Sequence, residues 1–335
     1  PAPAPKTAAD AILQEAWVSE PVPGDELDSL VAWPTEDGRV WLIATAKATH
    51  HLALYDADTG QRLRTVGGPG TAVGQFNRPN GIAVFGDLLF VAERDNHRVQ
   101  AFRLPEFAPL GAFGADVLRS PYGLWVHEPA PGELELFVTD SFMADFRTMT
   151  LPPMAELAGR VKRFQVRIED GGKLETRLLG QFGDTGAAGA LRMVESIAGD
   201  PAHGRLLIAE EDRRVGSTLR DYTLAGHYNG RSLATFDADA EGIALWACSA
   251  EDGYWVAVDQ LTPTRFRVFD RATLAPAGVF SGKVTSNTDG ETVYAMPTPR
   301  FPAGALFALH NDVSLAAFDL RDIARALDLK GDCPR

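Results

Sequence analysis

The strongest constraint on the fold is a sequence unit that recurs along the chain. Each copy opens with a polar or aromatic residue that leads a short apolar run, and after a turn a second apolar run ends in polar residues. The openings lie 42 to 73 residues apart, at Asp28, Asn80, Tyr122, Glu195, Glu241 and Asp289. A unit that recurs after several tens of residues indicates a solenoid or a propeller.

The later part of the unit supplies two more strands. Several copies continue with a third run that ends in an aromatic residue, as in residues 99–102 and 266–269, and a fourth run follows a tight turn, as in residues 61–66. The intervening segments are rich in Gly, Pro, Asp and Asn, and helical periodicity is almost absent. Four antiparallel strands in roughly 40 to 50 residues make one propeller blade. We therefore predict an all-β fold, a six-bladed β-propeller with four antiparallel strands per blade.

The segments outside the repeat set the expected domain organisation. We expect residues 25–335 to form a single propeller domain, preceded by an N-terminal leader over residues 1–24 that is flexible or forms a short helix. Residues 8–18 and 320–329 are the candidates for terminal helices, and residues 142–159 are an insertion in the third unit. The Pro/Ala-rich start is typical of a processed, exported chain, so we expect a secreted or periplasmic protein.

The sequence does not decide whether the two cysteines are bonded to each other. Cys248 and Cys333 are 85 positions apart and lack a metal-binding spacing. A long-range disulfide and two buried thiols are both compatible with this separation. A disulfide would fix the C-terminal tail to the propeller.

The net charge of −13 limits the possible partners. Nucleic-acid binding requires clustered Lys and Arg, so an acidic chain argues against it. No apolar run reaches the roughly 18 to 20 residues that span a bilayer. The acidic balance suits a protein that binds cations, and we expect a monomer.

The propeller geometry turns the unit openings into a candidate site. The innermost strands of a propeller surround a central channel, so equivalent positions in different blades converge at one end of it. Four of the six openings are carboxylates, and Asp239 precedes Glu241 in the same acidic stretch. Carboxylates packed together oppose one another's ionisation. A divalent cation removes this repulsion, and hard oxygen ligands favour Ca²⁺ over zinc.

A second set of polar residues follows the second strand of each unit and would lie beside this ring. These residues are Lys47, Arg94, Glu211, Gln260 and His310. Next to an acidic ring filled with cations, Lys47 and Arg94 are suited to hold an anion such as a phosphate.

Several segments resemble a known family. The similarity is most specific at Asp239-Ala-Glu241-Gly-Ile-Ala-Leu and Asn287-Thr-Asp289-Gly, and it extends over residues 253–260 and 265–271. Weaker similarities lie at residues 46–56, 122–124 and 195–212, so that most of the chain is covered. These segments resemble the β-propeller phytases, which are calcium-dependent phosphatases that act on inositol hexakisphosphate.

The resemblance implies a reaction and roles for individual residues. Several Ca²⁺ ions held by carboxylates would activate a water that attacks phosphorus, while basic side chains neutralise the phosphoryl oxygens. The metal ligands would be Asp28, Glu195, Asp239, Glu241 and Asp289. The catalytic residues would be Glu211, Gln260 and Asp289, and the residues that bind a phosphoester such as phytate would be Lys47, Arg94 and Tyr122.

Some positions depart from the family pattern. The paired aspartates that the family has near its start are Leu27-Asp28 here, and the first aspartate of the later motif is Asn287. A further basic residue expected after the third blade has no clear counterpart, although Arg160 and Lys162 are nearby. Fewer anionic ligands predict weaker or fewer calcium sites.

Two other functions remain open at this level. Residues 74–84 and 91–102 are similar to the repeat of NHL-type propellers, which often serve as binding scaffolds without catalysis. A calcium-dependent propeller lactonase or esterase would use one metal ion and a His or Asp base instead of several metal ions with basic residues around them. A propeller fold by itself does not decide among these functions.

Overall fold

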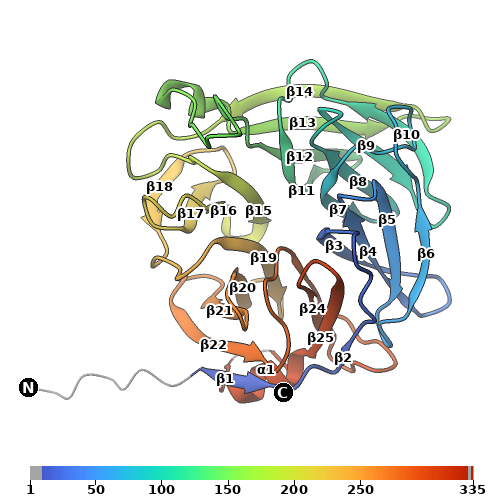
Figure 1. Cartoon of the computed structure of the whole chain (residues 1–335), viewed down its shortest axis with the longest axis vertical. Helices are drawn as coiled ribbons and strands as arrows, with labels where there is room; N and C mark the ends of the chain where they lie inside the picture. Colours follow the sequence, from blue (N-terminus) through green and yellow to red (C-terminus); the bar gives the residue numbers. More distant parts are fainter. Residues whose placement is uncertain (1–9, 331–332, 335) are drawn as a thin grey trace, which may run out of the picture.

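Six small antiparallel sheets arranged around a centre account for nearly all of the regular structure (Figure 1). The computed structural model describes residues 10–330 and 333–334 of the 335-residue chain. The innermost strands of neighbouring sheets contact one another in sequence, and the innermost strand of the last sheet contacts that of the first. The ring is therefore closed, and the predicted six-bladed β-propeller is confirmed.

The first four blades each consist of four consecutive strands. The first blade contains β3 (Leu27–Pro34), β4 (Val40–Ala46), β5 (His51–Asp56) and β6 (Arg62–Val66), and the second contains β7 (Pro79–Phe85), β8 (Leu88–Glu93), β9 (Arg98–Arg103) and β10 (Ala108–Phe113). The third contains β11 (Pro121–Ala130), β12 (Glu133–Asp140), β13 (Val161–Ile168) and β14 (Leu174–Phe182). The fourth contains β15 (Val194–Asp200), β16 (Arg205–Glu210), β17 (Thr218–Thr223) and β18 (Tyr228–Ser232).

The last two blades combine both ends of the chain. The fifth contains β19 (Ala240–Ala247), β20 (Gly253–Asp259), β21 (Arg265–Asp270) and β22 (Pro276–Gly282), with β1 (Ala11–Leu13) added in parallel to β22. The sixth contains β23 (Glu291–Tyr294), β24 (Ala305–His310) and β25 (Ser314–Asp319), with β2 (Trp17–Val18) as its outermost strand.

The N-terminal strands correct the expectation of a helix within residues 8–18 and of a separate leader over residues 1–24. Both strands pair with the exposed edges of the outer strands, which offer main-chain hydrogen bonds that a local helix cannot use. Trp17 also packs on Phe307 and donates its indole N–H to the carbonyl oxygen of Ala57 at 3.1 Å. Residues 1–9 of the expected leader lie outside the described residues.

The C-terminal segment forms the expected helix. Helix α1 (Leu320–Ala326) begins after Asp319, whose carboxylate accepts a hydrogen bond from the backbone N–H of Arg321 and so caps the helix. The tail then returns to the fifth blade, where Cys333 forms a disulfide with Cys248 across a Cα–Cα distance of 4.9 Å. The sequence left open whether the two cysteines form a disulfide or remain buried thiols, and the structure contains the disulfide. It is consistent with an oxidising, extracellular compartment.

The insertion over residues 142–159 is mostly irregular and ends in the 3-10 helix η1 (Met154–Gly159). A second short 3-10 helix, η2 (Pro201–His203), joins β15 to β16. Among the described residues, no helix is both long and apolar enough to cross a membrane.

The hydrophobic core is divided into six clusters, one between each pair of neighbouring blades. Between the third and fourth blades, for example, Phe182 packs between Phe137 and Tyr222, with ring centroids 6.2 and 5.9 Å away. The second strand of each blade is buried along nearly its whole length, which explains the continuous apolar runs in the sequence. Packing between blades thereby fixes the position of the inner strands around the channel.

Candidate functional site

The unit openings lie on an irregularity that the first five blades share. In each of these blades the register between the first and second strands shifts just after the first residue pair, for example between Leu27 and Leu30 and between Ala240 and Ile243. Such a bulge redirects the side chain at this point. It falls at Asp28 and Glu241, and at the equivalent residues of the other three blades.

The bulge also requires a small residue at the next position. A Cβ atom at Gly81 would collide with the carbonyl oxygen of Tyr122, and one at Gly123 would collide with that of Glu195. The inner strands can therefore approach closely only because these positions are glycine. The close approach brings the opening residues of neighbouring blades together at one end of the channel.

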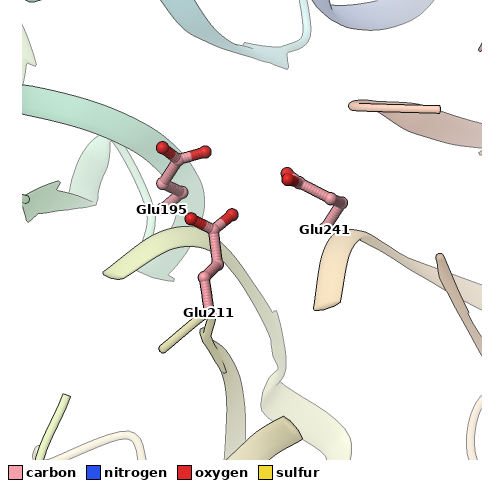
Figure 2. A group of neighbouring side chains, drawn as sticks. All are labelled: Glu195, Glu211 and Glu241. Carbon is pink, nitrogen blue, oxygen red and sulfur yellow. The ribbon is translucent and has the colours of Figure 1, made fainter. Parts of the chain in front are cut away.

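Three glutamates from two blades form the centre of the site. One carboxylate oxygen from each of Glu195, Glu211 and Glu241 lies within 4.8 Å of the others (Figure 2). Glu195 and Glu241 are unit openings, and Glu211 directly follows β16. In Figure 2 the carboxyl groups of Glu195 and Glu211 lie side by side, and Glu241 points toward them from the fifth blade.

A lysine joins the two aspartates on the other side of the channel mouth. The Lys47 ammonium lies 3.1 Å from an oxygen of Asp28 and 3.7 Å from one of Asp289. Tyr122 donates its hydroxyl to Asp28 at 2.8 Å, and Gln260 donates its side-chain amide to Asp289 at 2.5 Å. We call these five residues and the three glutamates the mouth cluster.

The mouth cluster has more acidic than basic groups, and this affects protonation. Burial, followed by repulsion from Asp28, raises the pKa of Glu195 to about 7 and that of Asp289 to about 8. Burial and the neighbouring carboxyl groups also raise the pKa of Glu211 and Glu241 well above the usual value. Several of these groups therefore hold protons at neutral pH when no cation is bound.

The pKa values of the basic group and the phenol in the cluster are raised as well. Burial alone would lower the pKa of Lys47, but the carboxylates of Asp28 and Asp289 raise it above the usual value, so the ammonium stays charged. Burial and then the charge of Asp28 raise the pKa of Tyr122, so its hydroxyl stays protonated. The cluster thus contains one group that stays positively charged, Lys47, and two neutral donors, the Tyr122 hydroxyl and the Gln260 amide.

These pKa values predict how calcium should stabilise the protein at different pH. Without cations, the raised pKa values of Glu195 and Asp289 favour the folded state below pH 4, and this contribution is lost as the pH rises through about 7 and about 8. A Ca²⁺ ion bound by these groups would displace their protons, so stabilisation by calcium would grow over the same pH range. We expect the calcium-induced rise in melting temperature to be small at pH 5 and several degrees larger at pH 8 or above. Thermal unfolding with calcium and with chelator at each pH measures this, and a rise independent of pH would contradict it.

Unpartnered oxygens in the cluster fit a hard cation. One carboxylate oxygen of Glu211 is buried and has no hydrogen-bond partner among the described residues. The same holds for the side-chain amide of Asn80, the opening residue of the second blade, which is completely buried. Carboxylate and amide oxygens are the ligands that Ca²⁺ prefers, so the donor set suits calcium.

Two of the residues expected at the site lie apart from the mouth cluster. Arg94 forms an exposed ion pair with its neighbour Asp95 at 2.8 Å. The Asp239 carboxylate lies 3.5 Å from Arg213. Burial raises its pKa, and the charged groups that act on it are Arg213 and Asp259, which are not part of the mouth cluster. Asp239 faces away because it precedes the bulge that turns Glu241 inward.

The basic residues near the end of the third blade are already engaged. The Arg160 guanidinium is completely buried and donates to four backbone carbonyl oxygens. Lys162 donates to the Asp140 carboxylate at 2.8 Å and to the carbonyl oxygen of Gly159 at 2.7 Å. Arg160 and Lys162 therefore leave the basic position after the third blade unfilled.

His310, at the end of β24 in the sixth blade, accepts the backbone N–H of Ser286 at 3.0 Å.

Two residues near the site were missed by the sequence pattern as ligand candidates. Asn80 occupies a unit opening, and its equivalence to the carboxylate openings was the available signal. Asp312 lies in the turn between β24 and β25, and its carboxyl group interacts with Asp289 and raises the pKa of that residue further. No repeat or motif marks Asp312, because the turn between the second and third strands differs in length and residue type from one unit to the next.

Fold and site together define a six-bladed β-propeller with a carboxylate-rich cluster at one mouth of its central channel. The NHL repeat model matches residues 76–102, which span β7 to β9 of the second blade. A solved structure described as a nidogen/laminin complex is similar with a TM-score of 0.56 and 16% identity, over 81% of this chain and 87% of that chain. At this identity the similarity concerns the fold alone. No curated protein sequence matches the chain.

Proposed function

We propose that the protein is a calcium-dependent phosphomonoester hydrolase of the phytase type, acting on inositol phosphates. The observation that carries this proposal is the position of Lys47, an anion-binding group held between two aspartates beside three clustered glutamates. Cation-binding and anion-binding groups in one cluster suit a phosphate bound through metal ions. The disulfide supports a secreted or periplasmic location.

The carboxylates of the mouth cluster would hold the calcium ions. Glu195, Glu211 and Glu241 supply the closest oxygens, and Asp28 and Asp289 supply more on the opposite side. Bound Ca²⁺ supplies Lewis-acid polarisation of phosphoryl oxygens and lowers the pKa of water. The carboxyl groups would lose their protons on binding a cation, and a carboxylate that does not ligate it would be available as a proton acceptor.

The remaining residues would bind and orient the substrate. Lys47 neutralises Asp28 and Asp289 in the cation-free protein. With a cation among the carboxylates, the Lys47 ammonium would no longer be needed to neutralise them and would be able to bind a phosphoryl oxygen instead. Tyr122 can donate its hydroxyl to the same group, and the Gln260 amide fixes the orientation of the Asp289 carboxylate by the bond at 2.5 Å.

The test is phosphate release by purified protein. We expect inorganic phosphate to be released from phytate when Ca²⁺ is present and release to stop when a chelator is added. Simple phosphomonoesters in parallel show whether the inositol ring is needed. If no phosphate is released from any substrate at any calcium concentration, the hydrolase proposal fails.

A second candidate function is a binding scaffold without catalysis. The NHL repeat match in the second blade favours it, because this repeat is found in propellers that present binding surfaces. Such a protein would still bind Ca²⁺ at the mouth cluster as a structural ion. Calcium-dependent stabilisation without phosphate release would therefore identify the scaffold.

A further inference from the structure

The channel continues inward from the mouth cluster through two rings, each with one residue from every blade. The first ring consists of Ser29, Gly81, Gly123, Ser196, Gly242 and Gly290. The second ring consists of Leu30, Ile82, Leu124, Ile197, Ile243 and Glu291. Five blades thus place an aliphatic side chain at a position where the sixth places a carboxylate.

Glu291 is buried without a partner. Its side chain is 8% exposed, and neither carboxylate oxygen has a hydrogen-bond partner among the described residues. Gly242 of the neighbouring blade lies against it, since a Cβ atom there would come within 3.0 Å of the Glu291 Cγ. The side chain is therefore held in the channel by packing and not by hydrogen bonds.

A buried carboxyl group without a partner is unfavourable in either protonation state. The ionised form lacks a counter-charge, and the neutral form has an O–H group that lacks an acceptor. A leucine or isoleucine would avoid both costs, as the other five blades show. A ligand in the channel would account for the carboxylate.

The surroundings of Glu291 suit a cation. The hollow lined by the two rings has a volume of about 90 Å³, well above the roughly 10–15 Å³ that a single water molecule needs. Ser29 and Ser196 line the first ring from opposite blades, and the Ser29 hydroxyl donates to Asp28 of the mouth cluster at 3.1 Å while its oxygen keeps acceptor lone pairs. Glu291 also lines a second hollow of about 310 Å³ toward the other end of the channel. Oxygen donors and room for water complete the shell of a hard cation.

We propose that Glu291 ligates a hard cation inside the channel, at a site separate from the mouth cluster. The Ser29 and Ser196 hydroxyls and water supply further oxygens. A single carboxylate balances a monovalent ion such as Na⁺ or K⁺ completely, whereas a divalent ion would require help from the nearby acidic groups.

The test is anomalous diffraction from crystals soaked in Rb⁺ as the monovalent probe and, separately, in Mn²⁺ as the divalent probe. We expect an anomalous peak within bonding distance of the Glu291 carboxylate in at least one soak, and the soak in which it occurs gives the charge of the ion. If Mn²⁺ occupies the mouth cluster while neither soak gives a peak at Glu291, the channel site does not exist.

Variants separate this site from the proposed phosphatase. Glu291→Gln and Glu291→Leu should both lose the channel peak and keep the mouth peaks, and Leu is the safer variant because the other blades carry an aliphatic residue there. Glu241→Gln is the matched control and should weaken the mouth peaks while the channel peak remains. A channel peak that persists in Glu291→Leu would overturn the assignment. The result does not depend on phosphate release, since the channel ion can be present whether or not the protein is a hydrolase.

Discussion

Glu241→Gln is expected to lower calcium-dependent phosphate release about 100-fold or more and to reduce the calcium-induced rise in melting temperature. Glutamine keeps the size of the side chain but removes one of three anionic oxygen donors that lie within 4.8 Å of one another. Even residues that only support a metal ligand cost about 10- to 100-fold in affinity or activity when replaced, so a direct ligand should reach at least the upper end of that range. Phosphate release over a series of calcium concentrations measures the effect.

Asp237→Asn is the matched control for this variant. Asp237 belongs to the same acidic stretch, but its side chain is 61% exposed and pairs with Arg265 and Arg267 outside the mouth cluster. The same loss of charge at Asp237 should leave both phosphate release and the calcium response unchanged. If Glu241→Gln shows an unchanged melting shift on calcium addition, Glu241 is not part of a cation site.

The propeller could be predicted from the repeat because the strands of every blade pack in the same way. Each unit must bury its second strand on both faces, and the recurring apolar runs with polar ends reflect this requirement. The pairing of the N-terminal strands was not predictable in the same way. Residues 11–13 and 17–18 are too short to show a strand period, and their partners, β22 and β25, lie about 270 and about 300 residues away along the chain.

The mouth cluster was predictable to the extent that it follows from the repeat. Asp28, Glu195, Glu241 and Asp289 occupy equivalent positions, so one geometric argument covered all of them. Arg94 and Asp239 were expected from residue type and resemblance, and local ion pairs with Asp95 and Arg213 hold them elsewhere. Such pairs depend on side-chain directions that the alternation of residues does not specify.

Residues at the ends of the second strands show another limit of the sequence pattern. Glu93, Asp140, Glu210 and Asp259 end β8, β12, β16 and β20, and all four are completely buried. Each accepts backbone N–H groups from the loop that leads into the inner strand of its own blade, as Glu210 does from Arg192 and Met193 at 2.7 and 3.0 Å. These carboxylates hold the loops in place, while in the fourth and fifth blades the next residue along the chain, Glu211 or Gln260, belongs to the mouth cluster. The two roles are adjacent in the sequence and cannot be separated by residue type.

Arg160→Met is expected to lower the free energy of unfolding by at least about 4 kcal/mol, because several buried carbonyl oxygens lose their donor at about 1–3 kcal/mol each. The Arg160 guanidinium donates to Asp140 and Phe142 in its own blade and to Leu191 and Arg192 before the fourth blade, at 2.6 to 2.9 Å. It therefore joins the insertion of the third blade to the segment that leads into Glu195. Equilibrium unfolding in urea measures the loss, and calcium affinity should fall with it.

Arg119→Met is the matched control, since Arg119 and Arg160 lie on the same aromatic ring. Their guanidinium carbons are 4.1 and 4.6 Å from the centre of Phe142. The Arg119 side chain is 54% exposed, and its ion pair with Glu156 spans 3.5 Å at the surface, so its loss should cost less than about 1 kcal/mol. The difference between the variants isolates the buried carbonyl contacts from the cation–π contact that both arginines make. Equal destabilisation by the two variants would mean that the ring contact, and not the carbonyl network, is what Arg160 contributes.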